Sequence, residues 1–171
     1  YSCYNTGNLS GQYNITGISS SEFNKIISYC YNIGKIETKG DAAGIVFQAE
    51  VIENCYNSGE INGTVSTSPG DIGGIVSEAQ SGYIINNCYN LGDININGAR
   101  GIGGIVGNSD IDTSISNCFN KGNLTSSVYT IGGISGWHGD VKKCYNTGNI
   151  TGAGNVGGIA GTYANIEECY N

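Results

Sequence analysis

Apolar residues recur along the chain at a few fixed distances from a cysteine. Six residues after each of the first six cysteines stands Ile or Leu, and a Gly-Ile pair follows in each of these repeats. A third aliphatic residue stands three positions before the next cysteine, as at Ile52 and Ile85. Apolar residues that occur singly or in pairs, separated by a few polar residues, predict several short strands per repeat and no long helix.

Alternation around the cysteine predicts which side chains point inward, because successive residues of a strand face opposite ways. The cysteine, the asparagine two residues later and the Ile or Leu six residues later share one face. The aromatic residue directly after the cysteine shares the other face with polar residues such as Lys35 and Glu60. We therefore expect the aromatic side chains outside, and a corner at the two polar residues before each cysteine.

Three columns of residues define the repeat. The cysteines are Cys3, Cys30, Cys55, Cys88, Cys118, Cys144 and Cys169. The asparagines are Asn5, Asn32, Asn57, Asn90, Asn120, Asn146 and Asn171. The aromatic residues are Tyr4, Tyr31, Tyr56, Tyr89, Phe119, Tyr145 and Tyr170.

A short strand with one apolar face cannot bury that face alone, so the repeats must stack. The sequence predicts an all-β fold, a parallel β-solenoid (β-helix) of about six rungs, with three short strands per rung and right-handed coiling. A single array spans residues 1–171. Its repeats cover 3–29, 30–54, 55–87, 88–117, 118–143 and 144–168, and a seventh begins at 169.

Differences in repeat length predict surface loops. Segments 75–85 and 105–115 are each three residues longer than in the shortest repeats, and the stretch from Thr64 to Asp71 contains the only proline. The first repeat is degenerate, with Thr16 in place of a glycine and an irregular stretch from Ser21 to Lys25. We expect these insertions on the outside of the solenoid.

Composition and charge exclude several classes of function. Glycine supplies 29 of the 171 residues, and the net charge is −7. The acidic residues are scattered, which predicts a solvated coat, and the lack of a Lys/Arg cluster argues against binding to nucleic acid or anionic membranes. No apolar run approaches the ~20 residues of a membrane span. The chain begins at Tyr1 without a signal peptide, which suggests a mature or excised segment.

The cysteine column has three interpretations. A straight row of thiols does not converge as tetrahedral metal ligands do, so we expect no metal. Disulfides need Cβ atoms near 3.8 Å, closer than the ~4.8 Å between rungs. Free cysteine is often buried, so we expect mostly free thiols that fill the core, with some disulfides as the alternative.

The other two columns also have a structural interpretation. The asparagines are expected to form a ladder, because stacked amides can bond to one another and to the turn backbone. The outward aromatic column is either a stack that stabilises neighbouring rungs or a binding face for a sugar or protein.

No catalytic or cofactor site is expected. Glu60 and Asp93 share one outward column at a spacing that resembles the carboxylates of a retaining glycosidase, but such neighbours are solvated. His138 is expected in a surface turn. Asp110 and Asp112 are too few ligands for a firm calcium site, and no phosphate-binding loop is present.

These columns resemble the bacterial GLUG-motif repeats, whose core is Gly-Leu-hydrophobic-Gly. The closest matches are Gly104-Ile105-Val106-Gly107, Gly133-Ile134-Ser135-Gly136 and Gly158-Ile159-Ala160-Gly161, with Phe47 and Ser77 in place of the last glycine elsewhere. Similar repeats occur in large surface proteins, including immunoglobulin-A-cleaving metallopeptidases. Their catalytic His-Glu-x-x-His motif is missing here, so the resemblance implies a fold and a context but no peptidase activity.

The function expected from the sequence is structural. The chain would serve as a stalk, spacer, adhesive or fibre-forming segment of a bacterial surface or secreted protein. The alternatives are a glycan- or protein-binding domain that uses the aromatic column or the inserted loops, and, third, a carbohydrate-active β-helix enzyme. The expected partners are further repeats of the array or copies of the chain stacked end to end, with a host protein or glycan as another possibility.

Overall fold

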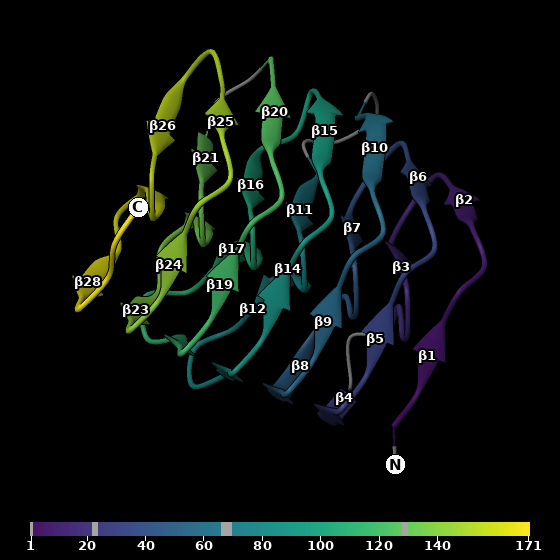
Figure 1. The fold of residues 1–171 in the computed structure, drawn as a ribbon, viewed down its shortest axis with the longest axis horizontal. Helices are drawn as coiled ribbons and strands as arrows, with labels where there is room; N and C mark the ends of the chain where they lie inside the picture. The colour runs from purple at the N-terminus through teal and green to yellow at the C-terminus, as the bar shows by residue number, and fades with distance from the viewer. Residues whose placement is uncertain (1, 22–23, 66–69, 128–129) are drawn as a thin grey trace.

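The chain coils into a parallel β-solenoid whose rungs follow one another from the N-terminus to the C-terminus (Figure 1). The computed structural model describes residues 2–21, 24–65, 70–127 and 130–171. Neighbouring strands of each sheet come from successive rungs, and they pair in parallel. The predicted all-β solenoid of about six rungs is confirmed. Within the described ranges, no helix is long and apolar enough to cross a bilayer.

The strands form five sheets, which we call A to E in chain order around the rung. Sheet A contains β1 (Tyr4–Asn5), β5 (Tyr31–Asn32), β9 (Tyr56–Asn57), β14 (Tyr89–Asn90), β19 (Phe119–Asn120) and β24 (Tyr145–Asn146). Sheet B contains β2 (Leu9–Gly11), β6 (Ile36–Thr38), β10 (Ile61–Thr64), β15 (Ile94–Asn97), β20 (Leu124–Ser126) and β25 (Ile150–Thr151). Sheet C contains β3 (Ile15–Thr16), β7 (Ala42–Ala43), β11 (Asp71–Gly73), β16 (Gly101–Gly103), β21 (Thr130–Gly132) and β26 (Asn155–Gly157). Sheet D contains β12 (Val76–Ala79), β17 (Val106–Ser109), β22 (Ser135–Trp137) and β27 (Ala160–Thr162). Sheet E contains β4 (Asn24–Ser28), β8 (Ala49–Glu53), β13 (Ile84–Asn86), β18 (Ser114–Ser116), β23 (Asp140–Lys142) and β28 (Asn165–Glu167).

A full rung therefore has five short strands where the sequence predicted three. The Asn-x-Gly bend separates sheet A from sheet B, and the Gly-Ile block separates sheet C from sheet D. Glycine is required at the first bend because successive rungs approach closely there. A Cβ atom on Gly59 would lie 2.0 Å from the carbonyl oxygen of Gly34 in the preceding rung.

The register places the same repeat position side by side on consecutive rungs. Tyr89 pairs with Tyr56 and Phe119, Ile61 pairs with Ile94, and Ile85 pairs with Ile115. Residues of the same sequence column therefore pair with one another on consecutive rungs, and each column forms a continuous ladder along the axis.

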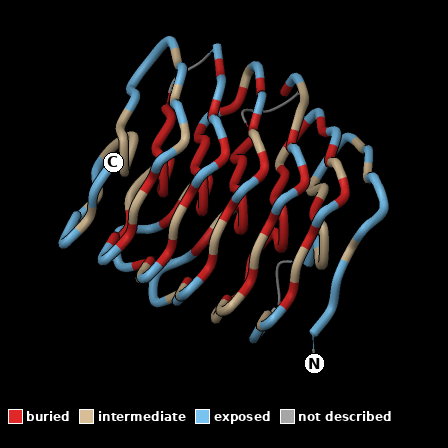
Figure 2. Tube along the Cα trace, in the orientation of Figure 1, coloured by how far each residue is buried: buried red, intermediate tan, exposed pale blue. Residues whose placement is uncertain are grey.

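The interior has two apolar compartments. One lies between sheets B and C and contains Ile61, Ile72 and Ile94. The other is enclosed by sheets D and E and the cysteine column, and it contains Ile105 and Ile115. Figure 2 shows the inward positions of the middle rungs buried, whereas the first and last rungs are largely exposed.

The predicted corner before each cysteine has a left-handed backbone. The residue that precedes the cysteine has a φ between 52° and 56° in six rungs, at Tyr29, Asn54, Asn87, Asn117, Lys143 and Glu168. Asparagine tolerates this conformation better than most residues, which explains why it fills three of these positions.

Two of the predicted insertions form outward turns. Ser81 and Gly82 turn between β12 and β13, and Ile111 and Asp112 turn between β17 and β18. The third prediction, a surface loop from Thr64 to Asp71, is wrong at its end, because Asp71 is 1% exposed and begins β11. Residues 66–69 of that stretch, like residues 22 and 23 of the first repeat, lie outside the described residues.

Candidate functional site

The asparagine column forms a hydrogen-bonded ladder inside the solenoid, between the two apolar compartments. The Asn57 Nδ2 group donates to Asn90 Oδ1 at 2.8 Å and to the Gly59 carbonyl at 2.9 Å. The same pair of bonds recurs in the other rungs, from Asn5 to Asn171. The predicted asparagine ladder is therefore confirmed, and its buried amides are satisfied.

The glycines of the Gly-Ile block pack against this ladder. A Cβ atom on Gly74 would lie 2.6 Å from Asn90 Cγ, and one on Gly104 would lie 2.5 Å from Asn120 Cγ. Side-chain bulk at these glycines would displace the amides. The Asn column and the Gly column, which are far apart in each repeat, are thus one structural unit.

Removing one amide from the ladder should destabilise the fold. Asn90→Ala removes one of the two acceptors of the buried Asn57 Nδ2 group and the amide that donates to the buried Oδ1 atom of Asn120, and we expect a loss of about 2 kcal/mol in unfolding free energy. Urea unfolding measures it. Asn95→Ala is the matched control, because Asn95 is exposed in the adjacent strand. Equal effects of the two substitutions would contradict the role of the buried ladder.

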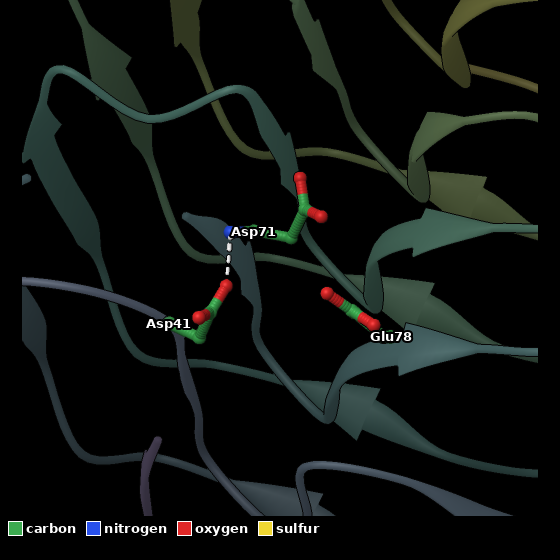
Figure 3. A group of neighbouring side chains, drawn as sticks. All are labelled: Asp41, Asp71 and Glu78. Carbon is green, nitrogen blue, oxygen red and sulfur yellow. Dashed lines mark hydrogen bonds between the residues drawn. The ribbon is translucent and has the colours of Figure 1, made fainter. Parts of the chain in front are cut away.

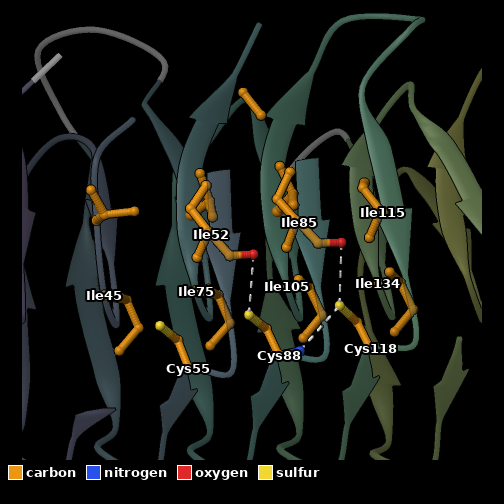
Figure 4. Packing of buried hydrophobic residues seen from close by; sticks show 14 of the residues in the cluster. Ile45, Ile52, Cys55, Ile75, Ile85, Cys88, Ile105, Ile115, Cys118 and Ile134 are labelled. Carbon is orange, nitrogen blue, oxygen red and sulfur yellow. Dashed lines mark hydrogen bonds between the residues drawn. The ribbon is translucent and has the colours of Figure 1, made fainter. Parts of the chain in front are cut away.

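The cysteine column lines the second compartment (Figure 4). Cys55, Cys88 and Cys118 are fully buried, whereas Cys3 is exposed and Cys169 is partly exposed; all seven are free thiols. Six of the thiols, from Cys30 to Cys169, make the same contact with the carbonyl two residues earlier, as where Cys118 Sγ donates to the Ser116 carbonyl at 3.1 Å. The backbone N–H of Cys88 donates to Cys118 Sγ in the next rung at 3.4 Å, so the sulfur accepts one hydrogen bond as well as donating one. Burial raises the pKa of the Cys118 thiol well above its ordinary value.

The aromatic column forms a continuous ring stack on the outer face of sheet A. Consecutive ring centroids lie 4.8 to 5.1 Å apart, with interplanar angles of 2° to 8°, from Tyr4 to Tyr170. The side chains of the middle rungs are half-buried. Each interior ring has a neighbour on both faces, so only ring edges and hydroxyl groups face outward.

A cluster of charged residues lies at the junction of sheets C and D, where sequence analysis expected only a solvated coat. Carboxylate oxygens of Asp41, Asp71 and Glu78 lie within 4.8 Å of one another (Figure 3). The Arg100 guanidinium binds both oxygens of Asp71, with Nε 3.1 Å from Oδ1. Asp41 accepts the Asp71 backbone N–H at 2.7 Å, and Glu78 accepts from Gln48.

We expect this cluster to make the unfolding free energy depend on pH. Burial raises the pKa of Glu78, and the charges of Asp71 and Asp41 raise it further. Burial also raises the pKa of Asp71, against the opposing effect of Arg100. An acid with a raised folded-state pKa is destabilising when ionised, so this cost disappears as the pH falls through that pKa.

Glu78→Gln should therefore stabilise the chain at neutral pH, and the gain should shrink on mild acidification as the wild-type Glu78 becomes protonated. Urea midpoints of both proteins at several pH values measure the difference, and the comparison cancels the other titrating groups. A stability gain that grows as the pH falls would show that folding does not raise the pKa of Glu78.

The other candidate residues have structural partners. Glu60 accepts from Asn62, while Asp93 accepts the backbone N–H of Asn123 at 2.7 Å, so the two carboxylates bond to different amides. Asn8 and Asn123 accept the next rung's backbone N–H in the same way. Three members of this outward column, Asn8, Asp93 and Asn123, therefore accept a backbone N–H from the next rung.

The two loop candidates also make local contacts. Asp110 and Asp112 accept from the backbone and the hydroxyl group of Ser81 in the preceding rung. His138 lies in a turn with a φ of 53°, its Nδ1 atom 3.0 Å from the Ser109 carbonyl oxygen and its ring beside that of Tyr163. These contacts tie neighbouring turns together.

The packing explains the Gly-Ile-hydrophobic-Gly segment. A Cβ atom on its last glycine, Gly107, would lie 2.6 Å from the backbone nitrogen of Ile72 in sheet C. Ser77 occupies the same position one rung earlier, and its hydroxyl group donates to the Asp71 carbonyl at 2.6 Å. The segment is the tight fold that brings sheet D against sheet C.

Comparison with known proteins agrees with this geometry. The model of the family described as the GLUG motif matches residues 98–125, which begin directly after β15 and run through β16, β17, β18 and β19 into β20. Curated proteins include no match to the chain. The resemblance read from the sequence is thus confirmed for this segment, and the protein is a β-solenoid repeat module that carries the GLUG motif.

Proposed function

We propose that this chain is a structural segment, a stalk or spacer, of a bacterial surface or secreted protein. The observation that supports this most strongly is that the asparagine and aromatic columns are completed by the same residue types in the neighbouring rungs. Asn90 bonds to Asn57 and Asn120, and Tyr89 stacks on Tyr56 and Phe119. Adding a rung therefore lengthens the array by ~4.8 Å without changing its cross-section.

The first and last rungs expose the faces that a neighbouring rung would cover. Val156 is 45% exposed and Ile166 is 52% exposed, whereas their partners Ile131 and Val141 in the previous rung are buried. Exposed apolar residues along unpaired strand edges favour further pairing. The partners we propose are more repeats of the same kind, in the same chain or in a stacked copy.

The stacked rings favour a structural role over sugar binding. Aromatic side chains hold a sugar against a ring face, and in the interior of the column both faces are already covered by neighbouring rings. The outer carboxylates Glu60 and Asp93 cap backbone or amide groups. We therefore propose no catalytic role for the array.

Duplication of two rungs tests the proposal. A second copy of residues 88–143 inserted after Lys143 joins a corner residue to Cys88, as in the natural sequence. Small-angle scattering should show a particle longer by ~10 Å with an unchanged cross-sectional radius. A wider particle, or an unfolded insert, would refute the spacer model. Antibody labelling of intact source cells tests the surface location separately.

A further inference from the structure

Two Asn-Gly dipeptides lie on neighbouring rungs of sheet B in very different settings. Asn62-Gly63 is in the middle of β10, and Asn97-Gly98 is at the end of β15. Asn-Gly is the sequence in which a backbone nitrogen reaches the preceding side-chain amide most easily, because glycine has no Cβ atom in the way. Any difference in reactivity between the two Asn-Gly pairs therefore comes from the fold around them.

We propose that Asn97 is a site of spontaneous deamidation and that Asn62 is protected. The backbone nitrogen of Gly98 attacks Cγ of Asn97, and a new C–N bond closes a five-membered imide. The bond from Cγ to Nδ2 breaks, and the amide leaves as ammonia with the proton from the Gly98 nitrogen. Water then opens the imide to aspartate or isoaspartate, so no reactant except water is needed.

The setting of Asn97 allows this reaction. Its side chain is exposed, and the described residues offer its amide no hydrogen-bond partner. Gly98 has left the strand with a φ of +90°, and no described group accepts a hydrogen bond from its N–H. Both the electrophile and the nucleophile are therefore free to approach each other.

The setting of Asn62 opposes it. Its Nδ2 group donates to Glu60 at 3.3 Å and its Oδ1 atom accepts from Asn95 at 3.0 Å. Gly63 pairs with both Thr38 and Ile96, and a Cβ atom on it would lie 2.0 Å from the Thr38 carbonyl oxygen. The imide can form here only after the strand opens locally.

The modification would act on the junction between the third and fourth rungs. The Asn97 carbonyl accepts the Val65 backbone N–H at 2.7 Å. Isoaspartate routes the main chain through the side-chain carbon and shifts this carbonyl, and either product adds a negative charge three residues before Arg100. We expect a lower urea midpoint for the modified fraction.

Peptide mapping by mass spectrometry after prolonged incubation of the folded chain tests the proposal. We expect the mass increase of deamidation and an isoaspartate product at Asn97, faster at alkaline pH because the attacking nitrogen must lose its proton. Asn62 should react at least about tenfold more slowly, since it needs local opening.

The same chain in denaturant is the control, and there the two sites should react at similar rates. Equal deamidation rates at Asn97 and Asn62 in the folded chain would overturn the proposal. So would an Asn97 that does not deamidate in the folded chain and reacts only in denaturant. An Asn97→Gln variant should lose the reaction at this site and keep the unmodified urea midpoint throughout the incubation.

Discussion

Replacing Ile105 with aspartate should cost roughly 4 kcal/mol or more of unfolding free energy, enough to unfold the middle rungs. Ile105 is fully buried in the second compartment, in the column with Ile75 and Ile134. The described residues that pack around it in this compartment are apolar side chains and thiols, so the new carboxylate would be buried among groups that cannot neutralise it. Urea or thermal unfolding followed by circular dichroism measures the loss.

Ile111→Asp is the matched control for this experiment. Ile111 belongs to the same rung, but it is 60% exposed in the turn between β17 and β18. We expect its substitution to change stability by less than about 0.5 kcal/mol. If the two variants unfolded at the same denaturant concentration, the assignment of inward and outward positions would be wrong.

Arg100→Ala should destabilise the chain by about 3 kcal/mol, because it leaves the buried Asp71 carboxylate beside Asp41 and Glu78 without its counter-charge. The expected loss is at the lower end for such pairs, since the Arg100 side chain is 45% exposed and partly screened by water. Chemical denaturation at neutral pH measures it.

The double variant Arg100→Ala with Asp71→Asn separates charge from packing. Removing the buried charge together with its partner should restore most of the stability, because no unpaired carboxylate remains. A double variant as unstable as Arg100→Ala alone would mean that the guanidinium acts through its contacts and not its charge. Lys142→Ala removes an exposed ion pair with Glu167 and should have little effect.

Most of the fold could be predicted because each repeat presents the same residue in the same place. The inward position of Asn90 and the outward position of Tyr89 follow from simple alternation along a strand. Their ladders follow from stacking in register. The regular spacing in the sequence predicts both ladders, because residues of one column pair with residues of the same column in the next rung.

Contacts between different columns could not be predicted in this way. The packing of Gly74 against Asn90, and of Gly107 against Ile72, depends on how the rung folds across its own width. The stretch that ends at Asp71 is an insertion and is therefore expected on the outside, but Asp71 begins a strand of sheet C and is buried where that sheet meets sheet D. The charged cluster with Arg100 was therefore missed, although one signal was present, an Asp at the same repeat position in successive rungs, Asp41 and Asp71.

The asparagine ladder gives the rod an electrical polarity. From Asn5 to Asn146, each Nδ2 group donates to the Oδ1 atom of the asparagine in the following rung, so the amide dipoles all point the same way. Aligned hydrogen bonds polarise and strengthen one another, as do the peptide dipoles of an α-helix. The N-terminal end presents acceptors and the C-terminal end presents donors. A rung turned the other way would set donor against donor, so the ladder can be continued only by a rung of the same orientation.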